Sequence, residues 1–192
     1  MMTTLTLPMG LDIDKTDTVK VTSEVKQIKS LLKSKQSILL TRLWTDLFNS
    51  DERITCLVWS QKQDESVFSR KQSTTIQDIH VGVGTPVLTT TECEEIIESI
   101  GFDPLGGLRV NEPDKDSKYY TAAKYVDLVY CPQDDFGLLD VEGAISEESK
   151  LLARQVNLIM QDECKELLIE KLGLGCTVLL RRDLTLVSVI LD

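Results

Sequence analysis

The chain has 192 residues, of which 42% are hydrophobic and 27% are charged. This composition is typical of a soluble globular protein and excludes a wholly disordered or collagen-like chain. The 31 acidic residues outnumber the 21 basic ones, and the net charge of −10 opposes broad, non-specific binding to nucleic acid or anionic lipid. The length predicts one compact domain over residues 1–192.

The cysteine pattern and the absence of recognisable sorting signals favour an intracellular compartment. The five cysteines are odd in number and include no CxxC pair, which is typical of free thiols under reducing conditions. The first residues lack the positive and apolar regions of a secretion signal, and no apolar run approaches the roughly 18 residues that a membrane span needs. We therefore expect an intracellular protein, cytoplasmic or nuclear.

The N-terminal quarter predicts a helix. Residues 1–15 fit a short strand or a loose tail. Between residues 22 and 48, apolar side chains recur at spacings of three, four and seven, which indicates one helix or two consecutive helices, with Ser34–Ser37 as the expected place of a break. The apolar positions are Val25, Ile28, Leu32, Leu39, Leu43 and Leu47.

The next segments alternate between strand and helix signals. Residues 54–59 are β-branched and aromatic, which predicts a buried strand, and the polar residues 60–73 predict a loop. Residues 75–83 alternate apolar and polar side chains, as in a half-buried strand. Thr91 and Glu94 have the spacing of a capping box at the start of a helix.

The second half of the chain predicts a long loop, an ambiguous segment, a helix and a terminal hairpin. Residues 102–118 are rich in Pro, Asp and Gly and predict a long surface loop, whereas residues 119–131 fit either a helix or a strand. Ser146 predicts the start of one long helix that ends at Gly173. Two apolar runs on either side of Arg182-Asp183 predict a β-hairpin whose strands are covered on both faces.

Together these elements predict an α+β (mixed α/β) fold. We expect a mixed or antiparallel sheet of about five or six strands with three or four helices. A basic N-terminal helical segment, a long C-terminal helix and a terminal β-hairpin should complete it.

Motifs for catalysis are weak. His80 is the only histidine, which excludes zinc sites that need two imidazoles. Cys56 or Cys131 would need His80 as a base to act as a nucleophile, but both lie in apolar runs, where a cysteine usually acts as a small hydrophobe. The glycines of Gly82-Val83-Gly84 and of Gly101–Gly106 fail the dinucleotide and P-loop patterns at their remaining positions.

Carboxylates of the middle region are the remaining candidates for metal binding. Oxygen ligands of this type suit magnesium or calcium, but their spacing does not match a calcium loop. We therefore predict neither a metal nor a cofactor. The residues concerned are Asp114, Asp116, Asp134, Asp135, Asp140 and Glu142.

Charge is distributed unevenly along the chain. Between Lys15 and Arg42, seven basic residues face two acidic ones, a net +5, and the rest of the chain carries −15. Helical spacing places Lys26, Lys29 and Lys33 in a basic ridge beside the apolar stripe, where they form a docking surface or an ordinary solvated face. The candidate partner-binding residues are Lys20, Lys26, Lys29, Lys33, Lys35 and Arg42.

These patterns favour a non-catalytic protein–protein interaction or assembly protein, a structural role. Its partner would be an acidic protein surface or a second copy of the chain, docked through the basic helix and the acidic remainder. A two-fold contact through the terminal hairpin or the C-terminal helix would give a homodimer. The alternatives are a small enzyme with a carboxylate or Cys–His site and a peripheral nucleic-acid or membrane binder that uses the basic helix.

Overall fold

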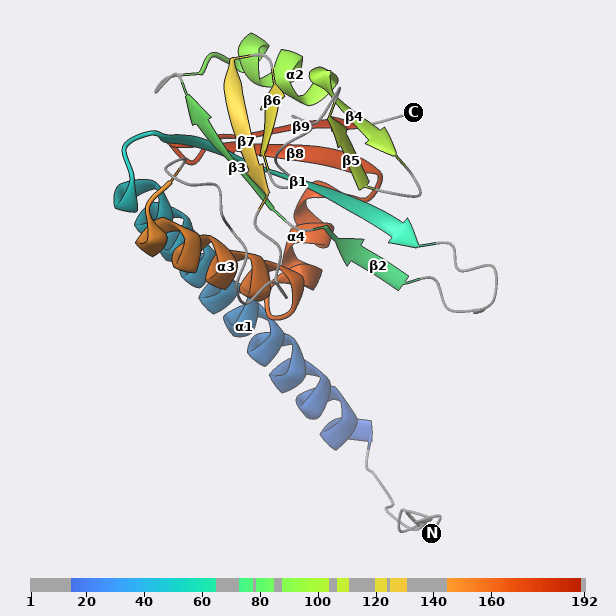
Figure 1. Ribbon diagram of the computed structural model, residues 1–192. Helices are drawn as coiled ribbons and strands as arrows, with labels where there is room; N and C mark the ends of the chain where they lie inside the picture. Colours follow the sequence, from blue (N-terminus) through green and yellow to red (C-terminus); the bar gives the residue numbers. More distant parts are fainter. Residues whose placement is uncertain are drawn as a thin grey trace, which may run out of the picture. The chain divides into compact units, whose positions relative to one another are not determined.

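The computed structural model describes residues 15–64, 73–77, 79–84, 88–103, 107–110, 120–123, 125–130 and 145–190 (Figure 1). The chain divides into two compact units, residues 1–35 and residues 36–192. The expectation of a single domain over residues 1–192 stays a prediction. Residues 1–14 of the expected tail lie outside the described residues.

One helix occupies the described part of the first unit and continues into the second. This helix, α1 (Lys15–Ser50), is unbroken through Ser34–Ser37, so the one-helix alternative is correct and the alternative with a break there is wrong. A Ser or Thr hydroxyl within a helix can donate to the carbonyl one turn earlier, and two such bonds follow the expected break. The Thr41 hydroxyl donates to the Ser37 carbonyl (2.9 Å), and the Thr45 hydroxyl donates to the Thr41 carbonyl (2.7 Å).

A seven-stranded antiparallel sheet forms the centre of the second unit, which confirms the predicted α+β class. The strand order is β6-β7-β3-β1-β8-β9, with β2 also paired to β1. The strands are β1 (Ile54–Asp64), β2 (Ser73–Ile76), β3 (His80–Gly84), β6 (Tyr120–Ala123), β7 (Val126–Tyr130), β8 (Cys176–Arg181) and β9 (Leu186–Ile190). A separate two-stranded sheet pairs β4 (Ile100–Asp103) with β5 (Gly107–Val110).

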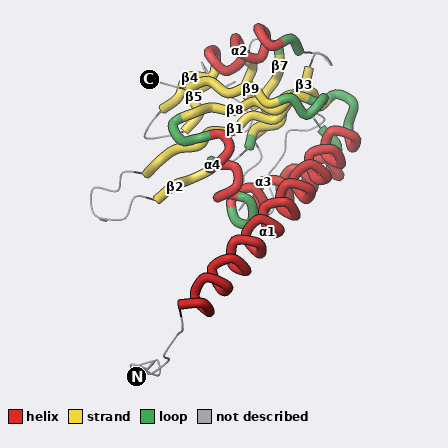
Figure 2. Tube along the Cα trace, turned by 180° about the vertical axis from the view of Figure 1, so that it is seen from behind, coloured by secondary structure: helices red, strands yellow, loops and turns green. Residues whose placement is uncertain are grey.

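Helices cover both faces of the seven-stranded sheet (Figures 1 and 2). Helix α2 (Thr90–Ser99) lies on one face, and the C-terminal half of α1 lies with α3 (Glu147–Gln161) and α4 (Lys165–Leu172) on the other. Strand β1 serves both cores by alternation, because Val58 packs toward α2 whereas Leu57 and Trp59 pack toward the three other helices.

Strand β1 is longer than its sequence pattern predicts. Residues 60–64 of the expected loop belong to β1, because residues 61–64 pair with β2 and residues 60–61 pair with β8. The strand expected over residues 75–83 is in fact two strands, β2 and β3, which pair with successive parts of β1. At the interruption the Gln77 amide donates to the Ser60 carbonyl (2.9 Å), so the chain stays attached to β1.

The N-cap of helix α2 (Thr90–Ser99) lies two residues before the predicted one. The N-cap is Thr89, not Thr91: the Glu92 amide donates to the Thr89 hydroxyl (3.2 Å), and the Thr89 amide donates to the Glu92 carboxylate (2.7 Å). Consecutive threonines and glutamates offer more than one capping box, and the register that buries Ile96 and Ile97 against the sheet selects this one.

The middle of the chain contains more strand than expected. The predicted loop of residues 102–118 contains the end of β4 and all of β5, and its other residues lie outside the described ranges. For residues 119–131, the strand alternative is correct, because β6 and β7 form an antiparallel pair at the edge of the sheet.

The single long C-terminal helix that the sequence predicts is two helices. Helix α3 begins at the predicted N-cap, where the Ser146 hydroxyl accepts from the Ser149 amide (3.1 Å). The chain then turns at residues 162–164, where the Cys164 amide donates to the Ile159 carbonyl (2.9 Å) in place of the carbonyl one residue later. The expected C-terminal glycine, Gly173, ends α4 with φ +88°.

The predicted terminal hairpin is present as β8 and β9. Its turn holds Leu184 at φ +64°, and the Arg181 amide donates to the Thr185 carbonyl (2.9 Å). Strand β8 is buried on both faces, as expected. Strand β9 is an edge strand that buries Val187 toward α2 and exposes Leu186, so full coverage of both strands is wrong.

Candidate protein–protein interface

The N-terminal half of α1 exposes a row of large apolar side chains. Every described side chain of the first unit, residues 20–35, is exposed. Five of them are large and apolar, with exposed fractions of 44–65%: Val21, Val25, Ile28, Leu31 and Leu32. Single exposed apolar residues are ordinary, but these recur at spacings of three, four and seven and therefore share one helix face. We call these five residues the apolar stripe.

The six predicted binding residues all lie on α1, and all are exposed. Lys26, Lys29 and Lys33 follow each other at spacings of three and four, which places them in one ridge along the flank of the apolar stripe. Arg42 belongs to the second unit, where its Nε lies 3.8 Å from an Asp46 oxygen. That these residues bind a partner stays a prediction.

The third face of this helix half carries small polar side chains. Ser30 and Ser34 are exposed. At 100° per residue they lie about 200° around the helix from Ile28 and Leu32. The apolar stripe is therefore confined to one side, which makes the serines suitable positions for control substitutions.

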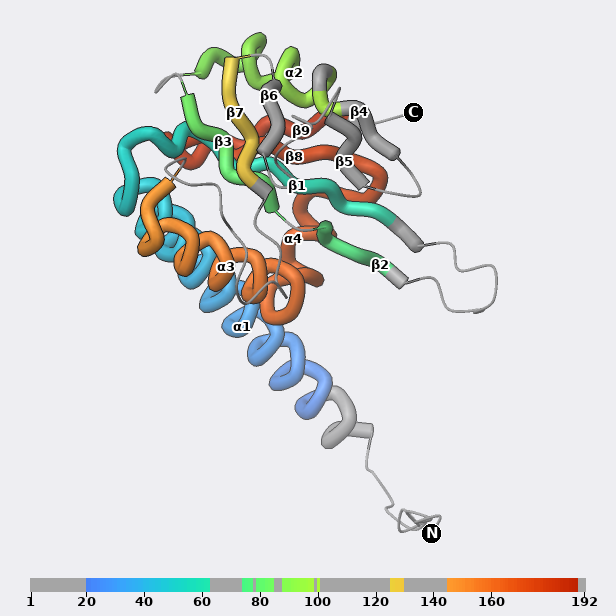
Figure 3. Tube along the Cα trace, in the orientation of Figure 1, coloured from blue at the N-terminus to red at the C-terminus, as the bar shows by residue number. Residues whose placement is uncertain are grey.

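The C-terminal half of α1 has its apolar partners within the second unit. Leu40, Trp44, Leu47 and Phe48 are at most 7% exposed, and the Trp44 ring stacks on Trp59 with centroids 6.3 Å apart. This half runs beside α3 (Figure 3), and the Ser50 and Ser149 hydroxyls of the two helices lie 2.7 Å apart.

This anchored half begins at Gln36. Its side chain donates to the Glu163 carbonyl, and its own carbonyl accepts from the Cys164 thiol (3.8 Å). Ile38 and Leu39 remain 60% and 38% exposed although Leu40 is buried. Ile38 and Leu39 lie about 200° and 100° around the helix from Leu40, so within the second unit the exposed apolar side chains and the buried one are on different faces.

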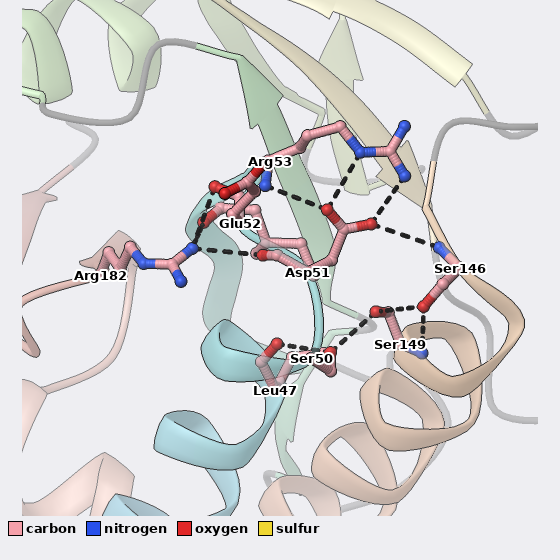
Figure 4. A network of polar contacts seen from close by, with 9 residues as sticks. Leu47, Ser50, Asp51, Glu52, Arg53, Ser146, Ser149 and Arg182 are labelled. Carbon is pink, nitrogen blue, oxygen red and sulfur yellow. Dashed lines mark hydrogen bonds and ion pairs between the residues drawn. The ribbon is translucent and has the colours of Figure 1, made fainter.

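A polar network fixes the end of α1 (Figure 4). One Asp51 oxygen accepts from the Arg53 amide and Nε (both 3.0 Å), and the other accepts from Arg53 Nη2 (2.7 Å) and from the Ser146 amide (3.4 Å). These bonds, with the Arg53 side chain as the largest cause, lower the pKa of Asp51 against the opposing effect of burial.

Arg182 ties the terminal hairpin to the same place. Its Nη1 donates to three backbone carbonyls, those of Asp51 (3.2 Å), Glu52 (3.1 Å) and Ile54 (2.8 Å). Residues far apart in sequence thus join the end of α1, the start of α3 and the turn before β9. No spacing pattern in the sequence signals this network, because its contacts depend on the fold.

The geometry does not support a nucleophile at Cys56. Burial raises the pKa of its thiol to about 12, so it is protonated at neutral pH. Cys56 is paired with Gly82 across β1 and β3, and His80 is paired with Val58, two residues along the same strand. A Cβ on Gly82 would collide with the Cys56 sulfur, which shows that this thiol fills space in the core. Cys131 lies outside the described residues.

The remaining predicted acidic residues also lie outside the described ranges: Asp114, Asp116, Asp134, Asp135, Asp140 and Glu142. Within the described ranges, no three His, Cys, Asp or Glu side chains gather closely enough to hold a metal ion. None of the helices in the described part combines the length and the apolar character that a membrane span requires.

Comparison with known protein families, with curated proteins and with solved structures gives no match. The predicted helical stripe includes Val25, Ile28 and Leu32 but not Val21 and Leu31. Their signal was available, since Val21 precedes Ile28 and Leu31 precedes Ile38 by seven residues.

Proposed function

We propose that this protein is a non-catalytic assembly protein that associates with further copies of itself through the N-terminal half of α1. The observation that carries the proposal is the apolar stripe, five large side chains on one face of a helix, all exposed. A patch of this kind marks a surface that another molecule covers.

The energetics favour association. Removing a Val, Leu or Ile side chain from water is worth about 1.5–3 kcal/mol when burial is complete, and each copy contributes five such side chains. The loss of translational and rotational freedom on association is about 4–15 kcal/mol, so several stripe residues must be buried together. A concentration-dependent oligomer is the expected behaviour.

Two surfaces of another copy suit this helix half. One is the same apolar stripe. The other is an acidic patch around the turn from α3 to α4, where Asp162, Glu163, Glu166 and Glu170 are exposed and opposite in charge to the lysine ridge. Docking on the acidic patch would weaken with salt, whereas apolar packing would not.

Light scattering tests the proposal. The molar mass of the wild type should exceed 21.6 kDa and rise with protein concentration. The double variant Ile28→Glu with Leu32→Glu should stay at the monomer mass, because two charges in the stripe oppose burial.

The matched control is Ser30→Glu with Ser34→Glu, which has the same charge change and the same four-residue spacing on the opposite face. It should assemble as the wild type does, and circular dichroism should show equal helix content in both variants. A wild type that is monomeric at every concentration, or equal assembly of both variants, would overturn the proposal.

A further inference from the structure

We infer that the stripe is covered by the same stripe of neighbouring copies, in a parallel, in-register bundle of three or four helices. The inference rests on the proposed self-association and specifies its geometry. It concerns only residues 20–35 of α1, all of whose described side chains are exposed.

The spacing of the stripe matches a heptad repeat. Val25 and Leu32 occupy positions a, and Val21 and Ile28 occupy positions d, so the steps along the seam are four, three and four. Leucine at a combined with isoleucine at d favours trimers and tetramers over dimers. Leu31 at position g widens the apolar surface beyond a narrow two-helix seam, which also favours a bundle.

Charge selects the parallel orientation. Glu24 is at position g, and Lys29 is at position e of the next heptad. In a parallel, in-register bundle, g of one helix faces the following e of its neighbour, so Glu24 of one copy meets Lys29 of the next. In an antiparallel arrangement g faces g and e faces e. Glu24 would then meet Glu24 or Leu31, and its charge would have no complement.

The other lysines are compatible with this arrangement. Lys26 and Lys33 are at position b and Lys20 is at position c, so all three point outward from the seam into solvent. Lys35 is at position d and ends the apolar seam. Salt screens both the repulsion between these outward lysines and the Glu24–Lys29 attraction, so it should change the association little, whereas it should clearly weaken docking on the acidic patch.

Disulfide trapping tests the orientation. In full-length protein with Cys131→Ser, the variant Ile28→Cys should form a covalent dimer under oxidised glutathione, because a parallel bundle brings identical d residues together. Ser30→Cys, at the outward position f, is the matched control and should not. An antiparallel arrangement would instead join Ile28→Cys of one copy to Leu32→Cys or Val25→Cys of another when the variants are mixed, and that result would overturn the inference.

Charge exchange tests the Glu24–Lys29 contact. Glu24→Lys and Lys29→Glu should each weaken association by about two- to fivefold for each helix–helix contact. The double exchange should restore it, since the pair is re-formed with the signs reversed. Lys26→Glu with Lys33→Glu should leave the mass unchanged. Dispersal by the latter variant, or no restoration by the double exchange, would contradict the bundle.

Different results would overturn the parallel bundle and the proposed self-association. If the stripe variant Ile28→Glu with Leu32→Glu disperses the oligomer but Ile28→Cys does not cross-link to itself, self-association stands and the parallel bundle falls. A dimer mass in place of three or four times 21.6 kDa would also overturn the bundle. If the stripe variant has no effect on the mass, both proposals fall.

Discussion

The two halves of α1 have similar amphipathic patterns and opposite environments. Residues 40–48 bury Leu40, Trp44, Leu47 and Phe48 in the core of the second unit, while residues 21–32 expose five side chains of comparable size. The pattern of apolar residues therefore identifies a face that needs a partner, but it does not say whether the partner belongs to the same chain. For residues 40–48 the partner is the core of the second unit, whereas the five large apolar side chains of residues 21–32 are exposed.

The exposed half also has weaker means of holding its own helix. It contains two valines and several serines among residues 20–35, which have lower helix propensity than leucine or alanine. Isolated helices of this length are marginal in water, and most helical stability in proteins comes from packing an amphipathic face. We therefore expect that covering the stripe stabilises this half of the helix.

The largest difference between the halves should appear in a matched pair of substitutions. Leu47→Ala should destabilise the monomer by about 2–5 kcal/mol, because Leu47 is fully buried and a cavity remains. Leu32→Ala should change the free energy of unfolding of the monomer by less than about 0.5 kcal/mol, because Leu32 is 55% exposed. Urea denaturation at low protein concentration measures both, and equal losses would contradict the division of α1 into two halves.

The anchor at the end of α1 should have the next largest effect. Arg182→Ala removes three bonds to backbone carbonyls and should lower the free energy of unfolding by about 1.5–3 kcal/mol. The control is Arg42→Ala, whose side chain is 81% exposed and 3.8 Å from Asp46, with an expected change below about 0.5 kcal/mol. Similar stability of the two variants would show that Arg182 does not anchor the helix.

A smaller, pH-dependent effect is expected at Asp51. The pKa of Asp51 is lowered in the folded state. The stabilisation of the folded state by its ionised carboxylate is therefore complete above the ordinary pKa of 3.8 and is lost as pH falls through the lowered pKa. Asp51→Asn should therefore be less stable than the wild type by about 1–2 kcal/mol at pH 7. The gap in unfolding free energy should narrow toward pH 3, and a gap independent of pH would rule out the charged network.

The smallest effect is expected in the alkylation of the buried cysteine thiols. Burial raises the pKa of Cys56, Cys93, Cys164 and Cys176, so iodoacetamide at pH 8 should leave all four unmodified while the protein is folded. A cysteine placed at position 28 should react readily in the monomer. Peptide mass mapping separates the sites, and rapid labelling of Cys164 would show that the contact at Gln36 opens.

The sequence predicted elements where local chemistry determines them. The hydroxyl of Ser146 and the free φ of Gly173 mark helix ends by themselves, and the apolar runs around Arg182-Asp183 favour a hairpin. The class of fold follows from such elements. The prediction failed at the turn between α3 and α4, because buried side chains continue across it from Met160 through Cys164 to Leu167.

Contacts between distant segments could not be predicted. The Asp51–Arg53–Ser146 network and the three carbonyls bound by Arg182 exist only after the sheet has brought these segments together. For the proposed interface, charge and periodicity predicted the helix and the basic ridge, and their part in binding stays a prediction. They could not show which half of the helix is covered, since that depends on where the core ends at Gln36.

Hydrogen exchange at two protein concentrations tests the central claim most directly. We expect the backbone amides of residues 20–35 to exchange rapidly in dilute protein and to become protected as concentration rises, while residues 40–48 are protected at both concentrations. This result would show that the exposed half of α1 acquires its partner from another copy. Equal exchange of residues 20–35 at both concentrations, across a range in which the molar mass increases, would place the contact elsewhere and contradict the account.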